Sequence, residues 1–265
     1  MAHGLITEVS EGVARIVVDR PEARNALSAE IVQGMADFVD SIEHDPAVRV
    51  VLIRGAGDHF MAGGDVKSFA QVMDKPLEEI RASFEARSAN AARLWIALER
   101  IPQPVVCMVR GFAAGASLSF VAGADFTIAS DGAMFILAHV GIGLVADAAT
   151  TYHLPRTVGL RKAKEIALFG DRLNAQQALD IGLVNKVVPD AELERETEAL
   201  LQRLAQGPAI ALAQAKWLMN ASLASDLAGQ IDRETTAVGV CGVSNDLKEG
   251  VLAFVEKRRP VFRGN

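Results

Sequence analysis

The stretch PVVCMVRGFAAGASLSFVAGADFTIAS, residues 104–130, decides which class of fold the chain adopts. Its first six residues are apolar and rich in β-formers, which predicts a strand buried on both faces. A glycine-rich segment at 111–117 follows and leads into an apolar helix, and residues 126–129 predict the next strand. Strands that alternate with helices predict an α/β core with crossover connections.

The same alternation extends outward on both sides of this stretch. Ser28 is the predicted N-cap of a helix, because apolar side chains recur at helical spacing from Ile31 to Ile42. Gly170 and Gly182 stand where helix C-caps belong. Further strands are predicted at residues 12–19, 50–53, 134–137 and 183–188, and further helices at 160–169 and 175–181.

The strands stop near residue 190, and only helices are predicted beyond it, the last of them with Asn245 as N-cap. We therefore divide the chain into an α/β core at residues 1–190 and a C-terminal helical region at 191–265. The helices predicted in this region cover residues 191–205, 208–223 and 245–257.

Composition and charge exclude several classes of protein. The chain has 265 residues, of which 50% are hydrophobic, and it should fold around a large core. A formal net charge of −6 argues against a nucleic-acid partner, because the longest basic run is Lys257-Arg258-Arg259. Cys107 and Cys241 lie too far apart in sequence to indicate a disulfide framework, and no spacing of histidines and acids predicts a metal site. Without a signal-peptide pattern or a membrane-length apolar run, we expect a soluble cytoplasmic protein with no membrane partner.

One glycine motif is a false lead. Residues 141–146 match the G-x-G-x-x-A pattern of dinucleotide-binding folds, and Glu165 follows at roughly the distance expected for a ribose-binding acid. That acid should end a strand, whereas Glu165 lies in a predicted helix. We therefore do not expect a dinucleotide cofactor.

Two other glycine-rich segments, 60–65 and 111–117, each follow a predicted buried strand. Small residues let backbone N–H groups approach a ligand closely, and a helix N-terminus favours anionic oxygen. Either segment taken singly is more often an ordinary turn. Their combination with the segment at 19–27, DRPEARNAL, indicates a shared site.

Over nearly its whole length the chain resembles the crotonase superfamily, the enoyl-CoA hydratases and isomerases. The resemblance implies a spiral of ββα units with a C-terminal helical layer, and a trimer or dimer of trimers. The matching pieces are R-P-x-x-x-N-A-L from Arg20, F-x-A-G-G-D from Phe60, P-x-P-V-V-x-x-V-x-G-x-A-A-G from Pro102, the segment 175–189, and E-G-x-x-A-F-x-E-K-R from Glu249.

The resemblance also implies which residues hold the substrate, an acyl-CoA thioester. The backbone N–H groups of Gly64 and Ala116 would bind the thioester oxygen, and preorganised donors of this kind contribute about 2.7–4 kcal/mol each to the transition state. No cofactor is implied beyond the CoA that the substrate carries. The implied CoA contacts are Arg24, Ala26, Ala62, Asp65 and Val66, together with Phe254 and Lys257, often from a neighbouring subunit.

The chain departs from the family at the proton-transfer residues. Ser119 and His139 occupy the positions of the two glutamates that activate water in family hydratases, and serine cannot act as an unaided base. Asp147 lies in G-L-x-x-D-x-x-x-T, which resembles superfamily isomerases in which an aspartate shuttles a proton. Asp147 would equally suit the N-cap of a helix that begins at Ala148. His139 would serve either as a second acid/base or as a packed histidine.

Three functions remain open on these grounds. The first is double-bond isomerisation of an enoyl-CoA through Asp147, and the second is hydration of a 2-enoyl-CoA. The third, of a different class, is binding of acyl-CoA without catalysis. The acyl group is undetermined, because the stretch 69–95, with Met73, Phe84, Leu94 and Trp95, could form either a substrate tunnel or plain core.

Overall fold

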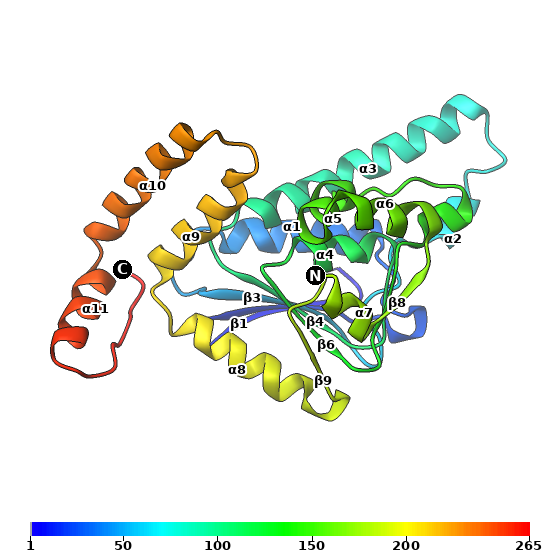
Figure 1. Cartoon of the computed structure of the whole chain (residues 1–265). Helices are drawn as coiled ribbons and strands as arrows, with labels where there is room; N and C mark the ends of the chain where they lie inside the picture. Colours follow the sequence, from blue (N-terminus) through cyan, green and yellow to red (C-terminus); the bar gives the residue numbers. More distant parts are fainter. Residues whose placement is uncertain (1) are drawn as a thin grey trace.

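In the computed structural model, which describes residues 2–265, a twisted six-stranded sheet forms the centre of the molecule (Figure 1). The strand order is β1-β2-β3-β4-β6-β9, and every pair is parallel except the antiparallel β1 and β2. These strands are β1 (Leu5–Ser10), β2 (Val13–Val18), β3 (Val50–Gly55), β4 (Val105–Val109), β6 (Phe126–Ser130) and β9 (Lys186–Val188).

A second sheet of three short strands extends from the first. Its order is β5-β7-β8, in which β5 (Phe112–Ala114) pairs in parallel with β7 (Met134–Ile136), and β7 pairs antiparallel with β8 (Arg172–Asn174). Each of β4 and β6 is followed within a few residues by a strand of this second sheet and then by helices. The expected ββα repeat is therefore confirmed.

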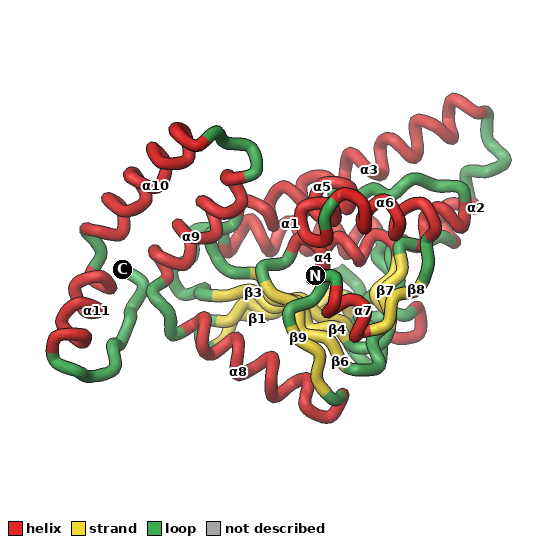
Figure 2. The backbone as a smooth tube through the Cα atoms, viewed as in Figure 1, coloured by secondary structure: helices red, strands yellow, loops and turns green. Residues whose placement is uncertain are grey.

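The larger hydrophobic core lies between the six-stranded sheet and most of the core helices. On the other side of the sheet, α8 buries Leu193, Leu201 and Leu204 in a smaller core (Figure 2). Because α8 covers the sheet, it belongs by packing to the α/β body although it follows residue 190. The helices up to α8 are α1 (Ala29–Ile42), α2 (Lys67–Ala70), α3 (Leu77–Arg100), α4 (Leu118–Gly123), α5 (Thr150–Val158), α6 (Leu160–Phe169), α7 (Ala175–Asp180) and α8 (Leu193–Ala205), with 3-10 turns at Pro21–Ala23, Gly115–Ser117, Ala138–Ile142 and Asp190–Glu192.

The last three helices, α9 (Ala209–Ser222), α10 (Leu227–Gly242) and α11 (Asn245–Val255), form an arm that projects from the body (Figure 1). Few of their side chains are buried, and among residues 2–265 one ion pair joins the arm to the body: Lys216 Nζ lies 2.9 Å from Asp125 Oδ2. Over residues 2–265, none of the helices combines the length and apolar character that crossing a bilayer requires. The large apolar side chains exposed along the arm are Trp217, Met219, Leu223, Leu227, Ile231, Val238, Val240, Val243, Leu247, Val251, Leu252, Phe254 and Val255.

Several boundaries differ from the expectations. Ser28 caps α1 as predicted, since its side chain accepts a hydrogen bond from the Ile31 N–H. The N-cap of α11 is Ser244 rather than Asn245, because the Ser244 hydroxyl accepts the Leu247 N–H at 3.0 Å. The last strand begins only at Lys186. The first strand, both outer strands of the small sheet and the helices α2, α3 and α10 were not predicted.

Candidate active site

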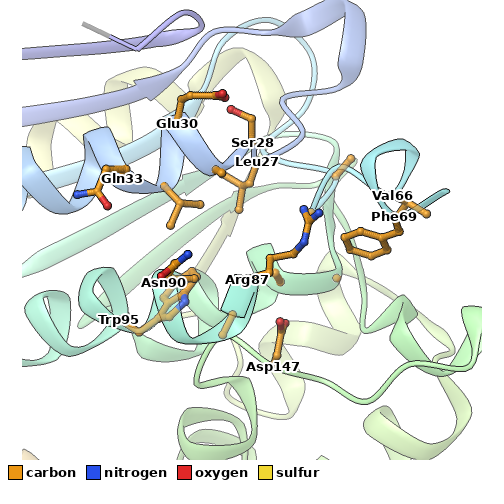
Figure 3. Close-up of a pocket in the computed structure, with 18 of the residues that line it drawn as sticks. Leu27, Ser28, Glu30, Gln33, Val66, Phe69, Arg87, Asn90, Trp95 and Asp147 are labelled. Atoms are coloured by element: carbon orange, nitrogen blue, oxygen red, sulfur yellow. The ribbon is translucent and has the colours of Figure 1, made fainter. Parts of the chain in front are cut away.

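A cavity of about 1160 Å³ opens between α1, α3 and the segments that follow β3, β5 and β7 (Figure 3). Both predicted oxyanion residues and both predicted acid/base residues line it. The residues that line it include Ser28, Glu30, Gln33, Asp37, Ala62, Gly64, Val66, Phe69, Ser83, Arg87, Asn90, Trp95, Ala116, His139 and Asp147.

The two glycine-rich segments lie side by side at this cavity. The Met61 N–H donates to Phe112 O at 3.1 Å, and the Ala114 N–H donates to Met61 O at 3.0 Å. The buried Ser117 hydroxyl is within 2.8 Å of both Met61 O and Ala114 O. Short parallel pairing therefore fixes the two segments against each other.

Gly63 is the residue that permits this close approach. Its φ is +87°, and a Cβ built on it would lie 2.6 Å from Ala114 O and 3.2 Å from Ala116 N. No side chain fits in that space, and L-residues rarely adopt that backbone conformation. Glycine at this position thus brings the first segment against the amide of Ala116.

The main-chain N–H groups of Gly64 and Ala116 are the free donors of the site. Hydrogen bonds on either side of Gly64, from Leu27 N–H to Gly63 O and from Asp65 N–H to Leu27 O, hold the segment in place. Within residues 2–265, neither the Gly64 nor the Ala116 N–H donates to another residue. Ala116 lies in the first turn before α4, where backbone donors point outward. Two fixed donors on one cavity suit an oxygen that becomes negative during a reaction.

Asn25, the asparagine of the DRPEARNAL segment at residues 19–27, holds neighbouring backbone segments together. It is fully buried with φ +57°, and its side-chain amide donates to Ala56 O at 2.9 Å and to His59 O at 2.7 Å. Its Oδ1 accepts the Arg20 N–H at 2.9 Å. The motif therefore braces the start of the first glycine-rich segment and takes no direct part in the chemistry.

Asp147 does not cap a helix. Helix α5 begins at Thr150, its N-cap residue is Ala149, and no side chain caps it. Ala148 and Ala149 have φ of +56° and +58°, so the chain turns sharply after Asp147 and its carboxylate faces the cavity (Figure 3). The apolar residues next to Asp147 in sequence, such as Val145, do not enclose its carboxylate in the single chain, because the Asp147 side chain is 42% exposed and Val145 is 74% exposed.

His139 lies next to Asp147 in the lining of the cavity. It is buried, its Nε2 lies 3.4 Å from Asp147 Oδ1, and its Nδ1 has no hydrogen-bond partner within residues 2–265. An imidazole protonated on Nε2 alone would donate toward the carboxylate and leave only an acceptor unpaired. Ser119 is also buried, and its hydroxyl donates to Ala148 O, so it holds the turn that positions Asp147.

The structure separates the predicted CoA contacts into two groups. Ala62 and Val66 line the cavity, and Asp65 lies beside Val66, 3.9 Å from Arg20. The other four do not line the cavity of this chain, and Phe254 lies on the projecting arm, 85% exposed. Those four are Arg24, Ala26, Phe254 and Lys257.

The sequence did not predict that α3 forms one wall of the cavity. Ser83, Arg87 and Asn90 face the cavity, and their spacing of four and three residues matches one side of a helix. Trp95, farther along α3, also lines the cavity. Such spacing was visible in the stretch left unassigned at 69–95. Of Met73, Phe84, Leu94 and Trp95, Trp95 lines the cavity and Leu94 is core, while Phe84 packs edge-to-face against Phe69 and Met73 is exposed.

Comparison with known proteins connects this geometry to one family. The sequence profile of Enoyl-CoA hydratase/isomerase matches residues 8–265. The chain is 33% identical to the 1,2-epoxyphenylacetyl-CoA isomerase of Escherichia coli over 100% of both chains, and 34% identical to the crotonyl-CoA hydratase of Syntrophomonas wolfei over 98% of both. A crystal structure of an enoyl-CoA hydratase from Bacillus anthracis, 29% identical, superposes with a TM-score of 0.91 over 99% of this chain and 100% of the other. The chain belongs to the enoyl-CoA hydratase/isomerase family, the crotonase superfamily, and is an enzyme of that family.

Proposed function

We propose that the enzyme moves a carbon–carbon double bond of an enoyl-CoA, from Δ3 to Δ2 or similarly, with Asp147 as the proton shuttle. The observation that carries the proposal is the Asp147 carboxylate, which faces the same cavity as the free Gly64 and Ala116 N–H groups. Each of the two glutamate positions holds a residue without a carboxylate, Ser119 and His139. One carboxylate and two donors suffice for isomerisation, which adds no water.

The reaction runs in two proton transfers. Asp147 takes the proton at C2 of a 3-enoyl-CoA, and the electron pair moves into the thioester carbonyl, whose oxygen becomes negative between the two N–H donors. The protonated Asp147 then returns the proton at C4. The double bond closes between C2 and C3, and the carboxylate is regenerated. The exchange is redox-neutral, and CoA enters only as part of the substrate.

His139 orients Asp147 in this scheme. Its Nε2 faces Asp147 Oδ1, and the distance of 3.4 Å is long for a hydrogen bond in the free enzyme. Catalytic hydrogen bonds in unliganded enzymes are often long and tighten when substrate binds. A donor on one carboxylate oxygen leaves the other free to reach the acyl chain.

Hydration of a 2-enoyl-CoA is the second candidate, because close relatives include hydratases as well as isomerases. Asp147 and His139 would then position a water molecule on one side of the acyl chain. A non-catalytic acyl-CoA binder would keep the two N–H donors and use neither side chain. The purified protein, given 3-enoyl-CoA and 2-enoyl-CoA in deuterated water, separates the three. Isomerisation with deuterium incorporation and no 3-hydroxyacyl-CoA supports our proposal, whereas binding without exchange would refute catalysis.

The variant Asp147→Asn tests the shuttle directly. We expect turnover to fall by about 10²–10⁴-fold, the contribution of a general base, with acyl-CoA affinity nearly unchanged because both donors remain. Asp171→Asn, at an exposed aspartate in the loop before β8, is the matched control and should have wild-type turnover. Full activity of Asp147→Asn would contradict the assignment.

We further propose that the arm packs against a second copy of the chain in a trimer or dimer of trimers. Its exposed apolar side chains support this, since contiguous apolar surface on this scale marks an association surface. In such an assembly Phe254 and Lys257 would reach the CoA of a neighbouring subunit. Light scattering at several concentrations would show trimers or hexamers, and a monomer throughout would refute the assembly.

We place the enzyme in the cytoplasm. Both cysteines are unpaired, Cys107 in the buried core and Cys241 on α10, which suits a reducing compartment. Fractionation of the native host should recover the protein with cytoplasmic markers.

A further inference from the structure

We propose that Arg87 selects the acyl group, and that the preferred substrate carries a carboxylate at the end of its acyl chain, away from the thioester. The inference rests on the proposed acyl-CoA function and gives its substrate class. Arg87 comes from α3 and points into the cavity from the side that also carries Phe69 (Figure 3).

Arg87 differs from the other arginines of its helix. Arg81, Arg93 and Arg100 each form an ion pair with a carboxylate, at 2.8, 2.6 and 2.6 Å. Arg87 has no carboxylate within 4.0 Å among residues 2–265, and it is the one of the four that lines the cavity. A partly buried guanidinium without a counter-ion is a ready partner for an anionic ligand.

The side chain is nevertheless held in place. Its Nη1 donates to Ser68 Oγ at 2.9 Å, and the Ser68 hydroxyl in turn donates to Asp65 O. The guanidinium also stacks over Phe69, with its central carbon 4.8 Å from the ring centre. These contacts occupy one face of the Arg87 guanidinium and its Nη1 atom. The Nε and Nη2 edge, which binds a carboxylate through two parallel hydrogen bonds, makes no hydrogen bond within the described chain.

Phe69 places this guanidinium close to the reacting end of the substrate. A Cβ built on Gly64 would lie 3.8 Å from Phe69 Cζ, so the ring borders the oxyanion donor. Arg87 stacks on the same ring, which puts the cation one aromatic ring away from the thioester site. An acyl chain of medium length, anchored at Gly64, spans that gap.

Three carboxylates share the cavity with Arg87, those of Glu30, Asp37 and Asp147, and none lies within 4.0 Å of its guanidinium. Asp37 already binds Gln33 and Arg93, at 2.9 and 2.6 Å. The Glu30 carboxylate lies beside Ser28 on α1, away from Arg87 (Figure 3).

Binding of two saturated ligands, hexanoyl-CoA and adipoyl-CoA, tests the inference without turnover. They share the CoA and the chain length and differ in the terminal carboxylate. Isothermal titration should show that wild-type enzyme binds adipoyl-CoA more tightly. In Arg87→Met, affinity for adipoyl-CoA should fall by about 10- to 100-fold, as for loss of a charged hydrogen-bonded pair, and affinity for hexanoyl-CoA should change little. Arg87→Lys should keep part of the preference.

Arg81→Met is the matched control, because Arg81 lies on the same helix, is exposed and pairs with Glu85. It should bind both ligands like the wild type. Equal losses of both ligands in Arg87→Met would overturn the inference, since they would mean that Arg87 binds a CoA phosphate or merely braces Phe69. Equal wild-type affinity for the two ligands would overturn it as well. Because no reaction is measured, failure of the proposed isomerisation would show separately in the deuterium experiment.

Discussion

Replacing Gly63 by alanine should disable the oxyanion site while leaving every functional side chain in place. The new Cβ would lie 2.6 Å from Ala114 O and 3.2 Å from Ala116 N, and both neighbours are backbone atoms of the paired segment. Since neither can rotate away, the two segments must separate. The N–H groups of Gly64 and Ala116 would then no longer be aimed at one oxygen.

The magnitude follows from two separate costs. Alanine at φ +87° costs about 1–2 kcal/mol of folding free energy, and overpacking adds about 1–3 kcal/mol. Misplacing one oxyanion donor lowers kcat by about 10²–10³-fold. Gly57→Ala separates these costs, because Gly57 has a comparable φ of +68° and its added Cβ would meet only Pro21, at an ordinary 3.5 Å.

Steady-state kinetics with 3-enoyl-CoA and thermal unfolding should be measured for both variants. We expect both to lose stability, Gly63→Ala more, and only Gly63→Ala to lose kcat. A folded Gly63→Ala enzyme with wild-type kcat would refute the idea that the paired segments form the oxyanion site.

Two further predictions concern the arm. Lys216→Met should lower the free energy of unfolding by about 3 kcal/mol, because it leaves the Asp125 carboxylate without its ion-pair partner. Lys162→Met removes an exposed ion pair and should lower it by less than about 0.5 kcal/mol. Denaturant titration of both variants measures the difference. The Arg258 guanidinium lowers the pKa of Glu249 from 4.5 to about 2, so this contact should stabilise the arm above pH 4.5 and lose its effect as the pH falls through 2. Hydrogen exchange between pH 5 and 2 should show that α11 of the wild type loses protection as Glu249 becomes protonated. The Glu249→Gln variant should lack this pH-dependent loss of protection.

The parts of the fold that were predictable are those whose pattern reports burial on both faces or a specific backbone conformation. The continuous apolar runs of β3 and β4 predicted strands because sheets covered by helices bury both faces. Helix α6 was predicted residue by residue, since Gly170 ends it in the left-handed conformation. Ser28 likewise marked the start of α1.

The parts that were missed lack that signal. Strand β1 buries only Leu5 fully and so shows neither a continuous nor an alternating apolar pattern. Helix α10 buries only Ala237 in the single chain, so its apolar side chains form no stripe directed at a core of its own. Asp147 resembled a helix cap because the two left-handed alanines after it have no sequence signature.

Those two alanines have a wider consequence for engineering the enzyme. Ala148 and Ala149 have positive φ, which costs an alanine about 1–2 kcal/mol of folding free energy. Glycine would adopt the same conformation without that cost. A search for thermostable variants would therefore be drawn to glycine at both positions. Glycine would also let the turn adopt other backbone conformations, and the Asp147 carboxylate would then no longer be held in one orientation toward the cavity. At these two positions a gain in thermal stability is thus expected to lower turnover. Stabilising substitutions should therefore be sought elsewhere in the chain.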